Sequence, residues 1–342
     1  SLKARVCVSG AKRLKHWIKQ RGLPLNPCGK VIVPTRRDLD NQLDLLANRA
    51  AANGANVSFW NKAELKKHIP EAETASNRAL WSPDTAVVKP QIVLTALEAE
   101  LKEKGVIIIK AEKKWEIDPE LSQIRLSNNS ILSYAHFINC AGLQADRLAK
   151  KFGVGLEYSL IPFKGVYWQI RQDCSIKIPS NLYPVPDLNV PFLGVHFTPS
   201  ADELPTISIG PTATFSFGRE NYLGIKGLEP MMSLNNARLL FRQYINNKDG
   251  FRGYFHNQAF LSVPNCFLNA ARELIPSIEM KHIEPSKKVG IRAQLFNHRK
   301  QALEDDFLCL SGKNSTHIMN AISPAFTASF ELADLILEQS NL

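Results

Sequence analysis

The stretch that decides the fold is FINCAGLQADRL, at residues 137–148. A short apolar run ends at the small-residue step Ala141-Gly142, and apolar residues then recur at helical spacing. This pattern predicts a strand, a turn and a helix. Gly142 has no Cβ, so its backbone can approach a ligand closely or adopt a positive φ. Because ligands bind at the carboxyl ends of strands in open α/β sheets, we predict one edge of a site here. An ordinary strand-to-helix turn is the alternative.

The rest of the chain predicts two kinds of structure. Helical spacing and stop signals predict helices over residues 2–20, 38–52, 62–68 (with Asn61 as N-cap), 92–104, 239–245, 270–275 and 326–337. The apolar run VIII at residues 106–109 predicts a strand buried on both faces, and residues 115–132 predict a small meander. Residues 156–285 alternate like strands and are rich in proline, which predicts an antiparallel sheet.

Further stretches carry a resemblance to a known family. They are IPFKG (161–165), YPVP (183–186) running to PFLGVHFT (191–198), GIRAQ (290–294) and NAISPA (320–325). With the turn at 137–148, they resemble flavin oxidoreductases of the D-amino-acid-oxidase superfamily, and within it the L-2-hydroxyglutarate oxidase/dehydrogenase family. The resemblance runs in order over nearly the whole chain. The family opens with a strand and a Gly-rich G-x-G-x-x-G turn, and this sequence matches it only after that fingerprint.

The resemblance implies an α/β fold in two interleaved domains. One is a doubly wound FAD/NAD(P)-binding domain, N-terminally incomplete in this sequence, formed by residues 1–27, 88–155 and 286–342. The other is a substrate domain with a mixed or antiparallel sheet (α+β), formed by residues 28–87 and 156–285.

The resemblance also implies the residues of the reaction. His196 is the expected base, because histidine titrates near neutral pH. Arg292 is the expected ligand of the substrate's C1 carboxylate, because arginine binds carboxylates through two hydrogen bonds. For a second carboxylate the candidates are Lys164, Tyr183 and Arg219. A structural histidine and a surface arginine are the alternatives for His196 and Arg292.

The expected cofactor is FAD, bound by two segments. The first is the turn Cys140, Ala141 and Gly142. The second comprises Asn320, Ser323, Pro324 and Ala325, where the free N–H groups at the start of the last helix stabilise negative charge.

The implied activity is FAD-dependent oxidation of the CH–OH group of L-2-hydroxyglutarate to give 2-oxoglutarate. The partners are then a small 2-hydroxy dicarboxylate and an electron acceptor, either oxygen or the quinone pool. Another flavin-dependent oxidase of a 2-hydroxy or amino acid is the first alternative. A truncated non-catalytic remnant, or one part of a split protein, is an alternative of a different class.

Composition narrows the class further. The whole net charge of +10 lies in residues 1–68, where 14 Lys/Arg face 4 acids (14 − 4 = +10). No nucleic-acid motif accompanies this excess. A basic amphipathic helix at residues 2–20 predicts either packing or peripheral membrane contact.

The six cysteines have no metal-ligand spacing, which predicts buried thiols, Cys140 among them, in a reducing compartment. G-x-S-x-G is absent, which excludes that class of serine hydrolase. The expected location is cytoplasmic, at the inner membrane's surface if membrane contact is made, or mitochondrial in a eukaryote.

Overall fold

The computed structural model describes residues 2–110, 112, 114–186, 194–247 and 250–340. The chain forms two compact units. Unit 1 comprises Ser1–Arg21, Pro90–Pro162 and Arg292–Leu342, and unit 2 comprises Gly22–Lys89 and Phe163–Ile291. The predicted domain boundaries lie close to these, and the largest difference is between a boundary expected after residue 155 and one found after Pro162.

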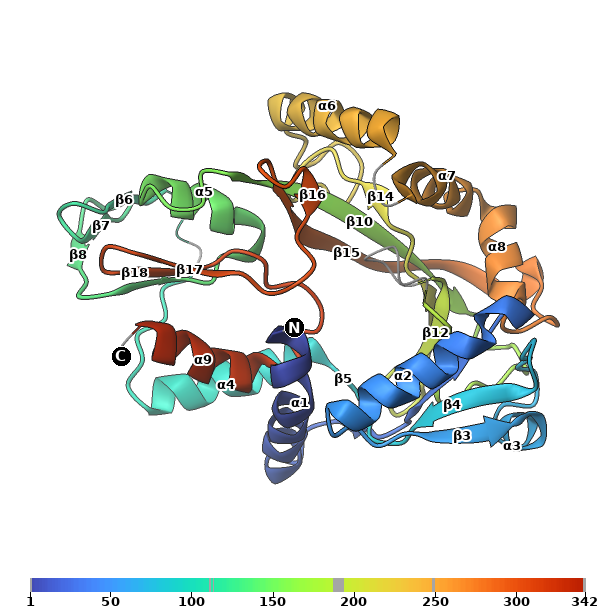
Figure 1. Cartoon of the computed structure of the whole chain (residues 1–342). Helices are drawn as coiled ribbons and strands as arrows, with labels where there is room; N and C mark the ends of the chain where they lie inside the picture. Colours follow the sequence, from blue (N-terminus) through green and yellow to red (C-terminus); the bar gives the residue numbers. More distant parts are fainter. Residues whose placement is uncertain (1, 111, 113, 187–193, 248–249, 341–342) are drawn as a thin grey trace. The chain divides into compact units, whose positions relative to one another are not determined.

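Unit 1 is built on a three-stranded sheet covered by helices on both faces (Figure 1). Strand β18 (Ser315–Ile318) pairs antiparallel with β17 (Cys309–Gly312) and parallel with β9 (Phe137–Asn139). Helices α1 (Leu2–Gln20) and α9 (Ser329–Ser340) share one core with β18, and α5 (Ala145–Lys151) shares a second core with the start of β10. Ile318, the last residue of β18, and Met319, the next residue in the chain, enter different cores.

The amphipathic helix predicted at residues 2–20 is confirmed as α1. Its apolar side chains Val6, Leu14 and Ile18 are buried, and Val6 packs against α9. The apolar face of this helix therefore packs inside unit 1, as the packing alternative predicted. Peripheral membrane contact through its basic face stays a prediction. Among the described residues, no helix has the length and apolar character needed to cross a membrane.

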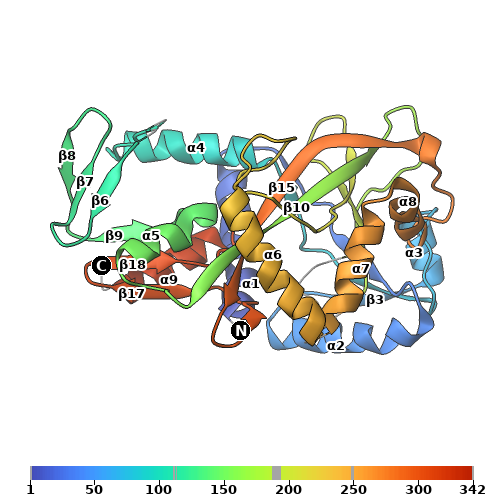
Figure 2. The same cartoon turned by 90° about the horizontal axis from the view of Figure 1, so that it is seen from above.

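The strand predicted at residues 106–109 is wrong. Helix α4 (Pro90–Glu103) ends as expected at Gly105, which has φ +81°. The apolar run that follows is irregular, and Ile107 is 88% exposed. An apolar run becomes a buried strand only if another strand satisfies its backbone, and none of the described strands pairs with it. The predicted meander is confirmed as β6 (Glu116–Asp118), β7 (Gln123–Arg125) and β8 (Ile131–Ser133), seen in Figure 2.

The larger sheet supports unit 2. Its two longest strands, β10 (Tyr158–Ile170) and β15 (Ile283–Asn297), lie side by side (Figure 2), and each begins in one unit and ends in the other. The strand order is β16 (Ala302–Leu303), β15, β10, β13 (Ile207–Gly210), β12 (His196–Pro199), β11 (Asn181–Pro184), β2 (Lys30–Val33), β4 (Arg78–Ser82) and β3 (Ser58–Asn61), with β14 (Thr214–Phe215) also on β10. The pair β11–β2 is parallel, so the sheet is mixed, as expected.

The two faces of this sheet differ in their cover. On one face, Phe197 and its neighbours form the main core with Phe267 of α8 (Pro264–Arg272) and Leu65 of α3 (Lys62–His68). On the other face, Leu43 of α2 (Asp40–Ala52) packs on Leu80 and neighbouring side chains. The rest of that second face carries the polar and aromatic residues of the candidate site.

The helices of unit 2 match the prediction unevenly. The N-cap expected at Asn61 is confirmed, and with Glu64 it forms a reciprocal capping box. Helix α6 (Pro230–Asn246) is much longer than predicted, α7 (Phe251–Leu261) was not predicted, and α8 begins six residues before the predicted helix at 270.

Candidate active site

His196 lies in a stacked pair with Tyr183. Strands β11 and β12 are antiparallel with Leu182 opposite Phe197, which brings the next residues, Tyr183 and His196, together. Their ring centroids are 3.9 Å apart with an interplanar angle of 17°. The side chain of His196 is 8% exposed, and its Nδ1 lies 2.8 Å from the carbonyl oxygen of Gly194. A carbonyl oxygen only accepts, so Nδ1–H donates and Nε2 keeps its lone pair.

Burial sets the protonation state of this pair. It lowers the pKa of His196 to about 4, although the hydrogen bond to Gly194 opposes this, and the charges of Lys30 and Lys288 lower the pKa further. Burial also raises the pKa of Tyr183 to about 12, so its hydroxyl stays protonated. At neutral pH the pair therefore offers one uncharged proton acceptor and one hydroxyl donor.

Gly210 allows a third ring to join the pair. It lies opposite His196 on β13 and has φ +132°, a backbone angle that residues with a side chain rarely adopt. A Cβ here would lie 3.3 Å from Cδ1 of Tyr167 and 3.1 Å from the carbonyl oxygen of Val166. Glycine therefore lets Tyr167 of β10 lie against β13 on this side of the sheet.

Two lysines complete a row of residues across the sheet. The Nζ of Lys30 lies 5.1 Å from the ring centroid of Tyr183, and the Nζ of Lys288 lies 4.4 Å from that of Tyr167. We call Lys30, Tyr183, His196, Tyr167 and Lys288 the tyrosine–histidine row. It has two cations and no acidic member, so it suits an anionic ligand.

Two predicted substrate ligands, Lys164 and Arg219, contact the segment before α6. The Nζ of Lys164 donates to Oδ1 of Asn221 at 3.2 Å, and Asn221 in turn donates to backbone carbonyls of the same loop. Arg219 is 5% exposed, and its backbone N–H donates to Glu229. Both residues thus help to hold the segment before α6. Of the three candidates, Tyr183 is the one that stacks on His196. Substrate binding by Lys164 and Arg219 stays a prediction.

The sequence reasoning missed Lys30, Tyr167 and Lys288. Each is a polar or aromatic residue within a strand, and this is the signal in the sequence that points to it. Of the PFLGVHFT run, residues 191–193 lie outside the described residues. Its remaining part contains Gly194 and His196, which the row uses.

The predicted cofactor turn in unit 1 is open. Asn139, the last residue of β9, is buried and accepts a hydrogen bond from the N–H of Ala141 at 3.1 Å. Gly142 has φ +51°, and no heavy atom lies within 4 Å of where its Cβ would be. The turn is thus a cradle of small residues with accessible backbone. Cys140 is exposed, so its prediction as a buried thiol is wrong.

The second predicted cofactor segment has a different structure from the one expected. Asn320 is fully buried, and its side chain accepts from Leu295 N–H and donates to the carbonyls of Glu304 and Asp306. Its amide is therefore occupied by the backbone of unit 1. The last helix begins at Ser329 rather than Phe326, so Ser323, Pro324 and Ala325 belong to a preceding turn. The prediction that they lie at a helix N-terminus is wrong, because this turn bonds locally, for example from Ala325 N–H to the Ile322 carbonyl at 2.9 Å.

Arg292 is the first residue of β15 that belongs to unit 1, and it is half-buried. Burial lowers the pKa of Lys3; Asp306 and Asp305 oppose this, and the charge of Arg292 lowers that pKa further. Arg292 thus lies near another cation. Its role as a carboxylate ligand stays a prediction.

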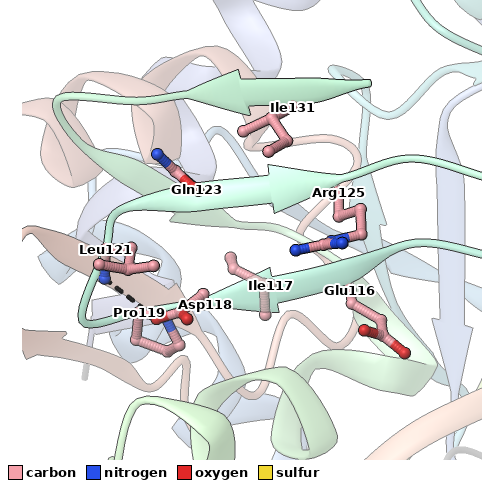
Figure 3. A pocket seen from close by; sticks show the side chains of 8 residues that line it. All are labelled: Glu116, Ile117, Asp118, Pro119, Leu121, Gln123, Arg125 and Ile131. Atoms are coloured by element: carbon pink, nitrogen blue, oxygen red, sulfur yellow. Dashed lines mark hydrogen bonds between the residues drawn. The ribbon is translucent and has the colours of Figure 1, made fainter. Parts of the chain in front are cut away.

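One surface pocket of about 410 Å³ lies on the meander of unit 1 (Figure 3). None of the predicted site residues lines it. The lining residues are Glu116, Ile117, Asp118, Pro119, Leu121, Gln123, Arg125 and Ile131. The pocket is therefore separate from the candidate site.

Comparison with solved structures shows the fold. The chain is similar to dithionite-reduced L-α-glycerophosphate oxidase from Mycoplasma pneumoniae with FAD bound, with a TM-score of 0.69 and 17% identity over 100% of this chain and 80% of that one. It is also similar to L-proline dehydrogenase from P. horikoshii, with a TM-score of 0.68 and 12% identity over 98% of this chain and 77% of that one.

Comparison of sequences identifies closer relatives. L-2-hydroxyglutarate dehydrogenase from Indibacter alkaliphilus is 30% identical over 99% of this chain and 84% of its own length. The mitochondrial L-2-hydroxyglutarate dehydrogenase of Mus musculus is 28% identical over 100% of this chain and 76% of its own length. The family model described as "FAD dependent oxidoreductase" (DAO) matches residues 1–339. The chain therefore belongs to the DAO family of FAD-dependent oxidoreductases.

Proposed function

We propose that this chain oxidises L-2-hydroxyglutarate to 2-oxoglutarate with FAD as cofactor. The observation that carries the proposal is the tyrosine–histidine row, where an uncharged His196 keeps a free Nε2 lone pair and lysines stand at both ends. A 2-hydroxy dicarboxylate needs both features, a base for its hydroxyl proton and cations for its carboxylates. The names of the sequence relatives support the choice of substrate.

The chain's residues fit a flavin at the turn after β9. The small side chains of Cys140 and Ala141 and the open space beside Gly142 leave room for a ring or phosphate to approach the backbone. When bound, FAD supplies the acceptor for the hydride that leaves the substrate's carbinol carbon. His196 takes the hydroxyl proton on Nε2, and Arg292 binds the C1 carboxylate. Tyr183 stacks on His196 and holds its ring in place.

The proposed function is tested by the absorbance spectrum of the purified chain loaded with FAD. We expect a bound-flavin spectrum that bleaches under anaerobic conditions when L-2-hydroxyglutarate is added. The amount of 2-oxoglutarate formed should equal the amount of flavin reduced. The D enantiomer is the matched control and should leave the spectrum unchanged. Faster bleaching by an amino acid would favour the alternative of an amino acid oxidase, and failure to take up flavin would contradict the proposal.

Replacing Arg292 by lysine tests the C1 carboxylate ligand. Lysine keeps the charge but cannot form two parallel hydrogen bonds, so the KM for L-2-hydroxyglutarate should rise roughly 10- to 100-fold, the value of one charged hydrogen bond. Steady-state kinetics of the FAD-loaded variant measure this change. Arg299→Lys, at an exposed arginine of unit 1, is the control. A KM equal to that of the control would remove Arg292 from the site.

A further inference from the structure

Lys288 is a member of the tyrosine–histidine row whose contact with the substrate has not been assigned. It lies on β15 with an exposed side chain, and its ammonium group stands over the ring of Tyr167 at 4.4 Å. The aromatic ring contacts this cation at the end of the tyrosine–histidine row.

The nearest acidic residue on the same strand face is engaged elsewhere. Glu284 lies four residues before Lys288, and strand residues four apart share a face. Its carboxylate accepts from Gln169 at 2.8 Å and pairs with Arg171 at 3.6 Å. Within the described part of the chain, Lys288 forms no ion pair with a carboxylate.

The positive charge of Lys288 reaches His196. Together with the charge of Lys30 it disfavours the protonated imidazole. Two lysines of the row therefore act on a neutral histidine, and none of the five residues of the row is acidic. Cations placed in this way attract an anion that arrives with the ligand.

We propose that Lys288 binds the distal carboxylate of the substrate and so selects dicarboxylic over monocarboxylic 2-hydroxy acids. This inference rests on the proposed function, and it replaces Lys164 and Arg219 as candidates for that carboxylate. Arg292 and His196 keep their roles toward the C1 carboxylate and the hydroxyl, which both kinds of acid share. Lys288 therefore determines specificity, not the chemistry.

The test compares two variants of adjacent lysines in the FAD-loaded protein. Lys288→Met removes the proposed ligand. Lys287→Met removes the same charge from an exposed neighbour on the opposite face of β15, so it controls for net charge. The substrates are L-2-hydroxyglutarate and L-2-hydroxyvalerate, which has the same five carbons but no distal carboxylate.

We expect Lys288→Met to lower kcat/KM for L-2-hydroxyglutarate by about 10- to 100-fold, the value of one charged hydrogen bond. For L-2-hydroxyvalerate the change should stay within about threefold, in the range of weak surface effects. Lys287→Met should match the unchanged protein with both substrates. Equal losses with both substrates, or no difference between the two variants, would overturn the inference.

A binding measurement separates this inference from the proposed function. Glutarate has both carboxylates but no hydroxyl, so its Kd, measured by titration calorimetry, does not depend on turnover. Lys288→Met should weaken glutarate binding by about 10-fold or more while Lys287→Met leaves it unchanged. An absence of glutarate binding, or equal affinity in both variants, overturns the role of Lys288. A protein that binds glutarate through Lys288 but does not oxidise L-2-hydroxyglutarate would contradict only the proposed function.

Discussion

His196→Asn should lower kcat by about 10²- to 10⁴-fold, the usual contribution of a positioned general base. Asparagine places an N–H near the position of Nδ1, so it can keep the hydrogen bond that His196 donates to the Gly194 carbonyl at 2.8 Å. It has no atom at the position of Nε2. The variant therefore removes the proton acceptor while it retains the local structure. Stopped-flow measurement of flavin bleaching reads the chemical step directly.

The pH dependence of the same reaction gives an independent signature. Because the pKa of His196 lies at about 4, kcat/KM should stay level from pH 8 down to about pH 5 and fall only below that. Bound substrate adds negative charge near the imidazole, which raises its pKa, so the acid limb of kcat should lie at higher pH than that of kcat/KM.

Two results would contradict this role. One is a kcat/KM limb near pH 6.5, which is the ordinary value for an exposed histidine. The other is a His196→Asn variant as fast as the control His256→Asn, which changes an exposed histidine of α7.

Acid should destabilise the protein well above the pH at which carboxylates titrate. His196 and His317 are both buried, and burial lowers each pKa to about 4. In the unfolded chain both titrate near 6.5, so between pH 6.5 and 4 the unfolded state binds more protons and the free energy of unfolding falls as pH falls. Each histidine contributes up to about 3 kcal/mol, and below pH 4 their effect levels off because the folded protein also takes up the protons.

The contacts of His317 explain why it resists protonation. Its Nδ1 lies 3.1 Å from Nδ2 of Asn139, and its Nε2 lies 3.1 Å from the Ser315 hydroxyl oxygen. Oδ1 of Asn139 accepts from the Ala141 N–H, which places the amide nitrogen toward the histidine. Nδ1 must therefore accept, and a proton there would face an N–H donor.

Urea unfolding followed by tryptophan fluorescence at several pH values measures this loss. The interval from pH 6.5 to 5 is the informative one, because carboxylates with lowered pKa contribute only at lower pH. His317→Gln should have a shallower pH dependence than the unchanged protein, even if the variant is less stable at pH 7. A free energy of unfolding that is constant across this interval would show that both histidines titrate normally when folded.

The active-site candidates show how far sequence reasoning reached. The turn at residues 140–142 and the base at His196 were expected from short stretches. The structure shows an open turn and a His196 stacked on Tyr183, and the two roles stay predictions. Lys164 and Arg219 were chosen because they are cations near recognisable stretches; in the structure the side chain of Lys164 donates to Asn221 and the backbone N–H of Arg219 donates to Glu229. Proximity in sequence was a poor guide here, because a β-sheet brings together residues from strands far apart in the chain.

Local structure was determined by the sequence alone wherever the deciding contacts are local. The capping box of Asn61 and Glu64, the helical spacing of apolar residues in α1 and the turn and helix after Asn139 depend on residues a few positions apart. Long-range pairing decided the rest. Residues 106–109 have the composition of a buried strand, but no described strand satisfies their backbone. The tyrosine–histidine row exists only because six strands align in register, with Gly210 leaving room for Tyr167, and that register depends on hydrogen bonds across the whole sheet.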